Sequence, residues 1–137
     1  MNSRDLESKG AGHWVKFRLD SKDELLAAAP EAPGTYVIRK PAPFGRFVGQ
    51  SDIVYIGSAE AGLRQRLRGY FEPGSSQATN PRIYAEMEKH ADFELAFVAA
   101  SSAGDAKSRE REWLVQYKQD HRELPPLNRS MPGAVDD

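Results

Sequence analysis

The chain has 137 residues, no cysteine and a formal net charge of -1. Its length predicts one domain with a single hydrophobic core, and the lack of cysteine excludes disulfide frameworks and thiolate metal sites. A near-neutral charge is not typical of a protein that binds nucleic acid tightly on its own, because lysine and arginine supply most of the non-specific affinity for phosphate.

Both ends of the chain are polar. Residues 1–12 contain no apolar run that could serve as a signal sequence or a membrane span, so we expect a cytoplasmic protein with no membrane partner. We also expect flexible tails over residues 1–12 and 131–137, on either side of one folded domain over residues 13–130.

Apolar periodicity places strands and helices in mixed order along this domain. Strands are predicted at 13–19, 36–39, 52–56 and 93–99, and helices at 21–29, 62–71, 81–90 and 103–120. Ser21 and Glu24 have the spacing of a capping box, which predicts a helix that begins at Ser21. Residues 74–77 are typical of a loop. The fold class that follows is α+β: a small antiparallel sheet of three or four strands, flanked by helices.

An arginine interrupts the apolar stripe of the helix predicted at 62–71. At helical spacing the inward face carries Leu63, Leu67 and Tyr70, and Arg66 falls on that same face. Arginine is almost never buried without a partner. Arg66 therefore either pairs with a carboxylate inside the protein or lines a cleft that receives an anion.

A glutamate interrupts the stripe of the helix predicted at 103–120 in the same way. Glu110 shares its face with Ala106, Trp113 and Tyr117, whereas Glu112 lies on a mixed face that solvent can cover. Glu110 is therefore the carboxylate whose place on an inward, apolar helix face needs an explanation. A structural ion pair with Arg66 is one interpretation of the two inward charges.

Two short motifs precede these helices. Gly34-Thr35-Tyr36 opens one predicted strand, and Tyr55-Ile56-Gly57 ends the next. With the arginine helix, the glutamate helix and Pro126-Leu127-Asn128, this order resembles the GIY-YIG nuclease family over roughly residues 30–130. The matching positions are Tyr36, Tyr55, Gly57, Arg66, Tyr70, Glu110 and Asn128. Thr35 replaces the usual isoleucine or valine, and the spacer between the two tyrosines is longer than in the homing endonucleases and the repair subunit of the family.

The resemblance implies a metal-dependent DNA endonuclease. Glu110 would hold one divalent ion, Mg²⁺ or Mn²⁺, since an ion held by a single carboxylate keeps most of its waters. Arg66 would clamp the scissile phosphate with its planar fork of donors. Tyr36 or Tyr55 would be the general base, and the choice between them stays open. Tyr70 and Asn128 complete the implied catalytic set.

Substrate binding is assigned to Gly57, Arg64, Arg68 and Lys89. Taken singly, Arg64, Arg68, Arg82, Lys89 and Arg129 are interpreted mainly as solvated charges, with contact to a phosphate as the alternative for each. The expected partner is DNA, duplex or branched, with a homodimer or a partner subunit as a further source of affinity. The alternative function is a non-catalytic nucleic-acid-binding or protein-interaction module on the same fold.

Overall fold

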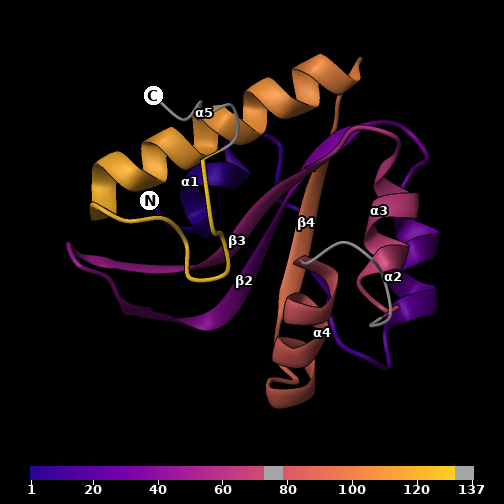
Figure 1. Cartoon of the computed structure of the whole chain (residues 1–137), viewed down its shortest axis with the longest axis horizontal. Coiled ribbons are helices and arrows are strands. Elements are labelled where there is room, and N and C mark those ends of the chain that lie inside the picture. Colours follow the sequence, from indigo (N-terminus) through magenta and orange to yellow (C-terminus); the bar gives the residue numbers. More distant parts are fainter. Residues whose placement is uncertain (73–78, 132–137) are drawn as a thin grey trace.

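The computed structural model describes residues 1–72 and 79–131 of the chain (Figure 1). The predicted loop at 74–77, and the expected C-terminal tail apart from Met131, lie outside these residues. The elements in chain order are α1 (Ser3–Glu7), β1 (Val15–Lys16), α2 (Lys22–Ala28), β2 (Gly34–Gly45), β3 (Gln50–Ala59), α3 (Leu63–Gly69), α4 (Thr79–Lys89), β4 (Glu94–Ala99) and α5 (Ala103–His121).

The strands form one antiparallel sheet in the order β1-β4-β2-β3. The α+β prediction is confirmed, and the short β1 is the fourth strand. Strands β2 and β3 make a long hairpin, and β3 lies at the edge of the sheet. An edge strand leaves one row of backbone groups available for partners outside the sheet.

Helices cover both faces of the sheet (Figure 1). Successive strand residues point to opposite faces. Tyr36 and Ile38 of β2 pack in one core with residues of α2, α3 and α4, whereas Val37 packs in a second core with residues of α1 and α5. Thr35 also faces α5, where its hydroxyl donates to the carbonyl of Ala106 at 2.9 Å. Isoleucine and valine have no hydroxyl and could not form this hydrogen bond.

A register shift in the hairpin changes the face on which Ile53 and the residues before it lie. Ile38 pairs with Tyr55, but the next residue, Arg39, pairs with Ile53, so Val54 is an extra residue on β3. Such a bulge re-aims the side chains on one side of it. Ile53 consequently packs in the α5 core, as Ile56 does, although the two are an odd number of positions apart. Tyr55 lies on the face that carries Tyr36 because the pairing from Ile38–Tyr55 to Tyr36–Gly57 is regular.

The N-terminal segment differs from the flexible tail that we expected over residues 1–12. It contains helix α1, which begins with a capping box between Asn2 and Asp5. Leu6 is fully buried in the α5 core, and Ser3 donates from its backbone N–H to Asp52 at 2.7 Å. A five-residue helix with one buried leucine carries too little periodicity to be recognised in the sequence.

The capping box predicted at Ser21 is wrong, although helix α2 does follow this residue. The Ser21 side chain makes no capping hydrogen bond. Its oxygen instead accepts from the Arg18 N–H and donates to the Lys16 carbonyl, each at 2.9 Å. The serine therefore holds the end of β1 against the start of α2.

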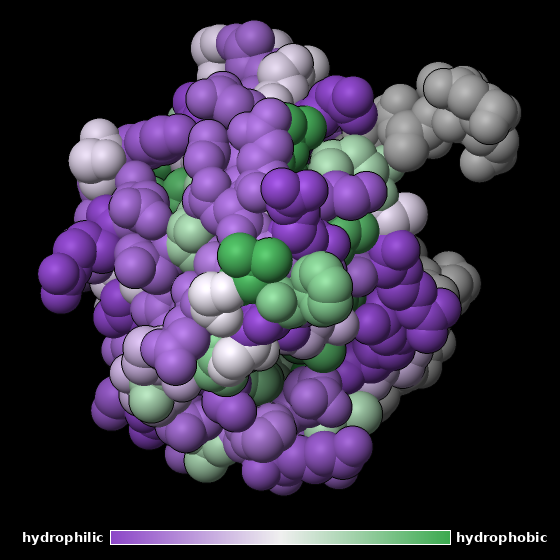
Figure 2. Space-filling view, turned by 90° about the vertical axis from the view of Figure 1, so that its left-hand side faces the viewer, coloured by the Kyte–Doolittle hydropathy of each residue, from purple (hydrophilic) through white to green (hydrophobic). Residues whose placement is uncertain are grey.

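Figure 2 views the molecule from the tip of the β2–β3 hairpin, where a small apolar patch interrupts a largely hydrophilic surface. The exposed apolar side chains at this tip are Phe47 and Val48, with exposed fractions of 81% and 45%. Within the part of the chain that is described, no helix is both long and apolar enough to cross a bilayer.

Candidate active site

Two tyrosines stand side by side on the face that α3 covers. Tyr36 of β2 and Tyr55 of β3 have ring centroids 6.1 Å apart. Gly57 pairs with Tyr36 in the sheet, and a Cβ atom there would lie 2.7 Å from ring carbons of both tyrosines. Real side chains do not tolerate such a distance. Gly57, which we had assigned to substrate binding, therefore makes room for the two rings.

Tyr36 and Tyr70 form a buried phenol pair. Both side chains are fully buried, and their hydroxyls are hydrogen-bonded to each other. Their rings pack edge to face at 6.0 Å. Burial raises the pKa of both phenols well above the ordinary value, Tyr55 adds to the effect, and Arg66 opposes it. Both groups therefore stay protonated near neutral pH, which disfavours either as a general base.

Tyr55 differs from this pair in its access to solvent. It is half-buried and lines two neighbouring clefts on the molecular surface. Of the three tyrosines in the predicted catalytic set, it is the one that lines these clefts.

Arg66 lies beside the phenol pair and faces the larger cleft. Buried Leu63 and Leu67 anchor helix α3 on the sheet, and Arg66 projects from the same side, as the helical spacing predicts. Its guanidinium carbon lies 4.6 Å from the centre of the Tyr70 ring. Its Nη1 donates to Oδ1 of Asn80 at 2.6 Å. Asn80, a buried residue of α4, was missed in the sequence because its partner is distant along the chain.

Glu110 approaches the site from the opposite face of the sheet. Its exposed fraction is 7%, and it accepts a hydrogen bond from the hydroxyl of Ser58 on β3. Burial raises the pKa of this carboxyl, while the Ser58 hydrogen bond and the nearby Lys107 oppose the shift. Glu110 and Arg66 thus have different hydrogen-bond partners. These contacts do not support the interpretation of the two charges as one structural pair.

These side chains meet at the free edge of β3, in two adjoining clefts. The larger cleft has a volume of about 690 Å³ and the smaller about 200 Å³. The polar residues of the larger cleft are Tyr55, Ser58, Glu60, Gln65, Arg66, Arg68, Glu72, Lys107 and Glu110. The smaller cleft is lined by Tyr55, Arg82, Lys107, Glu110, Leu127, Asn128, Arg129 and Ser130.

Asn128 closes the edge of β3 rather than the mouth of a cleft. Its side-chain amide bonds to both the N–H and the C=O of Ile56, at 3.0 and 2.8 Å. The backbone N–H of Leu127 also donates to Val54, at 3.0 Å. Asn128 therefore positions the Tyr55-Ile56-Gly57 segment, and its own polar atoms are already engaged.

The remaining residues assigned to substrate binding lie in different places. Arg68 lines the larger cleft. Arg64 donates to the carbonyls of Leu26 and Ala29, at 3.2 and 3.0 Å, and so ties α3 to α2. Lys89 pairs with Glu86 at 3.7 Å and lines neither cleft. The structure therefore brings Arg68 to the site but gives Arg64 a structural contact.

The donors present fit a loosely held divalent ion. No group of three or more His, Asp or Glu side chains in residues 1–72 and 79–131 could hold a metal. Glu110 is a buried carboxylate at the boundary of two open clefts, and burial raises its pKa. Such a donor suits Mg²⁺, which retains several waters and needs few protein ligands.

Comparison with known proteins finds similarity to a curated protein and to solved domains. No model of a known protein family matches the sequence. A stretch of 78 residues, 57% of the chain, is 38% identical to the UvrABC system protein C of Gloeobacter violaceus, of which it covers 10%.

Among solved structures, the chain is similar to the GIY-YIG N-terminal endonuclease domain of UvrC from Thermotoga maritima, bound to its catalytic magnesium ion. The TM-score is 0.50 at 24% identity, over 80% of this chain and 98% of that domain. A point mutant of the same domain gives a TM-score of 0.52 at 24% identity. The chain thus spans a small part of its curated relative but nearly all of the solved domain.

Proposed function

We propose that this chain, which has the fold of a GIY-YIG domain, is a metal-dependent endonuclease that hydrolyses phosphodiester bonds in DNA. The observation that carries this proposal is the meeting of Tyr55, Arg66 and Glu110 at one cleft. They come from a strand and two helices on opposite faces of the sheet, and the free edge of β3 lets them approach one phosphate from different sides.

In this proposal Arg66 is the phosphate clamp. Its planar guanidinium offers donors in a fork that matches two phosphate oxygens. Asn80 engages Nη1 at 2.6 Å and so fixes the plane of the group. A guanidinium held in one plane loses little conformational freedom when it binds a phosphate.

Tyr55 is the proposed general base. In its phenolate form, Tyr55 Oη would accept a proton from the attacking water, whose oxygen bonds to phosphorus as the bond to the leaving sugar oxygen breaks. Tyr36 is a poor candidate because burial raises its pKa and its hydroxyl is bonded to Tyr70. The Tyr36–Tyr70 pair would instead support the Tyr55 and Arg66 side chains by packing.

Glu110 would hold the divalent ion, with Ser58 fixing one of its oxygens. When bound, Mg²⁺ or Mn²⁺ would supply Lewis-acid stabilisation of the negative charge on the phosphate and the leaving oxygen. Lys107 lines the same cleft and adds positive charge there.

The test is cleavage of labelled linear, flap and branched DNAs, with an RNA of the same sequence, in the presence and absence of Mg²⁺ or Mn²⁺. We expect metal-dependent cleavage of at least one DNA by the wild-type chain and its loss in Glu110→Gln. Glu112→Gln is the matched control, because Glu112 is exposed on the same helix and lies outside both clefts. Binding without cleavage under all conditions would favour the non-catalytic alternative.

A further inference from the structure

The smaller cleft has no role in the mechanism described so far. It adjoins the larger cleft along a ridge, because Tyr55, Lys107 and Glu110 line both. The ridge carries the proposed base and the proposed metal ligand. A nucleic-acid strand that places one phosphate against Arg66 and Glu110 must continue beyond the ridge on at least one side.

The two clefts differ in charge. Three basic and three acidic side chains line the larger one, so its formal charges balance. Three basic side chains and one acidic side chain line the smaller one: Arg82, Lys107, Arg129 and Glu110. A concave surface with an excess of positive charge concentrates anions even on a near-neutral protein. The smaller cleft is therefore the more anion-attracting of the two.

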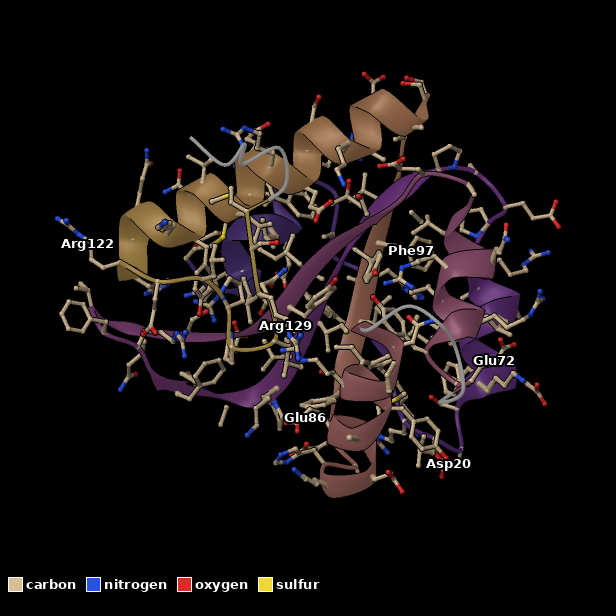
Figure 3. The ribbon with its side chains drawn as sticks, viewed as in Figure 1. Asp20, Glu72, Glu86, Phe97, Arg122 and Arg129 are labelled. Atoms are coloured by element: carbon tan, nitrogen blue, oxygen red, sulfur yellow. The ribbon has the colours of Figure 1, made fainter. Side chains whose placement is uncertain are left out.

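The two arginines of the smaller cleft are held on fixed backbones. Arg82 is half-buried on α4, a helix anchored in the core by Ile83 and Met87. Arg129 follows Asn128, whose amide is bonded to β3. Figure 3 shows Arg129 between the loop after α5 and helix α4.

Neither arginine has a carboxylate partner among the described residues. Arg82 is half-buried, and a half-buried guanidinium without such a partner is expected to receive an external anion. Arg129 is exposed, and it lines the same cleft. This revises the interpretation of Arg82 and Arg129 as solvated charges.

We propose that the smaller cleft is a subsite for a backbone phosphate next to the scissile one, bound by Arg82 and Arg129. The inference rests on the proposed function for the identity of the ligand. It assigns the substrate strand a path: the scissile phosphate lies in the larger cleft, the strand crosses the ridge of Tyr55, Lys107 and Glu110, and the neighbouring phosphate lies in the smaller cleft. The site then recognises a strand with a phosphate on each side of the ridge.

The experiment compares the double variant R82Q/R129Q with R4Q/K118Q. Both remove two positive charges, but Arg4 and Lys118 are exposed on α1 and α5 and line neither cleft. Binding of a labelled DNA is measured in EDTA over a range of salt concentrations. Loss of two phosphate contacts should lower the salt slope by roughly 1.5 and weaken binding roughly 10- to 20-fold at 150 mM salt. The control should keep the wild-type slope.

Cleavage kinetics with Mg²⁺ separate this inference from the proposed function. We expect R82Q/R129Q to raise KM by a similar factor with kcat within about two-fold of wild type, since its groups bind a phosphate that does not react. If the wild-type chain cleaves DNA and the two double variants bind DNA equally well, the subsite is overturned and the endonuclease function stands. If the wild-type chain binds DNA but does not cleave it, the endonuclease function is overturned. The binding of the two double variants then still decides whether the smaller cleft is a phosphate subsite. Loss of folding in R82Q/R129Q, seen by circular dichroism, would show that the arginines are structural and overturn the subsite too.

Discussion

Asn128 forms two hydrogen bonds with a single residue, Ile56. Its Oδ1 accepts from the Ile56 N–H at 3.0 Å, and its Nδ2 donates to the Ile56 carbonyl at 2.8 Å. Ile56 lies between Tyr55 and Gly57, so one amide outside the sheet closes the edge strand where the proposed base is attached. The side chain continues the backbone hydrogen-bonding pattern of the sheet, and this explains why asparagine serves here.

Asn128→Asp is expected to destabilise this edge. A carboxylate accepts from the Ile56 N–H but cannot donate to the Ile56 carbonyl, and it places negative charge against that oxygen. The loss should be about 1 to 3 kcal/mol of unfolding free energy. Melting followed by circular dichroism measures it. Ser130→Ala, two residues away and exposed, should leave the melting temperature unchanged, and an equal melting temperature in Asn128→Asp would refute the positioning role.

Substitution of single tyrosines should separate the base from the buried pair. Tyr55→Phe is expected to lower kcat by about 10²- to 10⁴-fold with little change in melting temperature, because it removes a general base from a half-buried position. Tyr36→Phe should instead cost about 1 to 3 kcal/mol of stability, because it leaves the buried Tyr70 hydroxyl without its Tyr36 partner.

The double variant Tyr36→Phe/Tyr70→Phe is the control for this comparison. Removing both partners of a buried hydrogen bond is less costly than removing one, so its stability should recover part of the loss. If Tyr36→Phe folded normally and lost more activity than Tyr55→Phe, the base would have to be Tyr36.

Helical spacing was sufficient to locate the charged members of the site in the sequence. Arg66 and Glu110 both interrupt apolar stripes, and the structure places both at the larger cleft. Regular periodicity also predicted the strands of the sheet and the helices other than α1, although β2 and β3 extend beyond their predicted bounds. These features are local, because each depends on residues within one or two turns of the same element.

Features that depend on tertiary contacts could not be predicted in this way. The face of Ile53 depends on the extra residue Val54, which appears only in the pairing of β2 with β3. The partners of the two charges, Asn80 for Arg66 and Ser58 for Glu110, are distant along the chain. A polar residue in a helix or strand gives no sign of which distant group it will meet.

Glu110→Gln should change stability in opposite ways with and without metal. Burial raises the pKa of Glu110, so the native state binds this proton more tightly than the unfolded chain does. The carboxyl therefore favours the native state most at low pH, and this contribution is lost as pH rises through the raised pKa. At neutral pH without metal, Glu110→Gln should melt about 3 to 5 °C higher for each kcal/mol of desolvation cost that it removes.

Addition of Mg²⁺ should reverse the order of the two melting temperatures, so that the wild type melts higher than Glu110→Gln. The ion would bind the native wild-type carboxylate and raise the melting temperature, and the neutral amide should show no such rise. Glu112→Gln should follow the wild type in both buffers, because Glu112 lies outside the clefts. An equal magnesium effect in Glu110→Gln and wild type would show that the ion binds elsewhere.

Asn80 is expected to act on catalysis through Arg66. Asn80→Ala removes the hydrogen bond that fixes Nη1, so we expect kcat to fall about 10-fold, the cost of a typical bond to a charged group. Asn80→Asp should keep the contact but hold the guanidinium more tightly against the new carboxylate, and should therefore also lower phosphate binding.

A double-mutant cycle with Arg66→Ala distinguishes positioning from general stability. Arg66→Ala alone should cost about 3 kcal/mol of transition-state stabilisation, as for other single charge-stabilising donors. If Asn80 acts only by orienting Arg66, Asn80→Ala should lower kcat no further in the Arg66→Ala background, although its effect on melting temperature would persist. If the two losses of kcat multiply in the double variant, Asn80 supports the cleft in another way. The guanidinium through which Asn80 is proposed to act is absent from that variant.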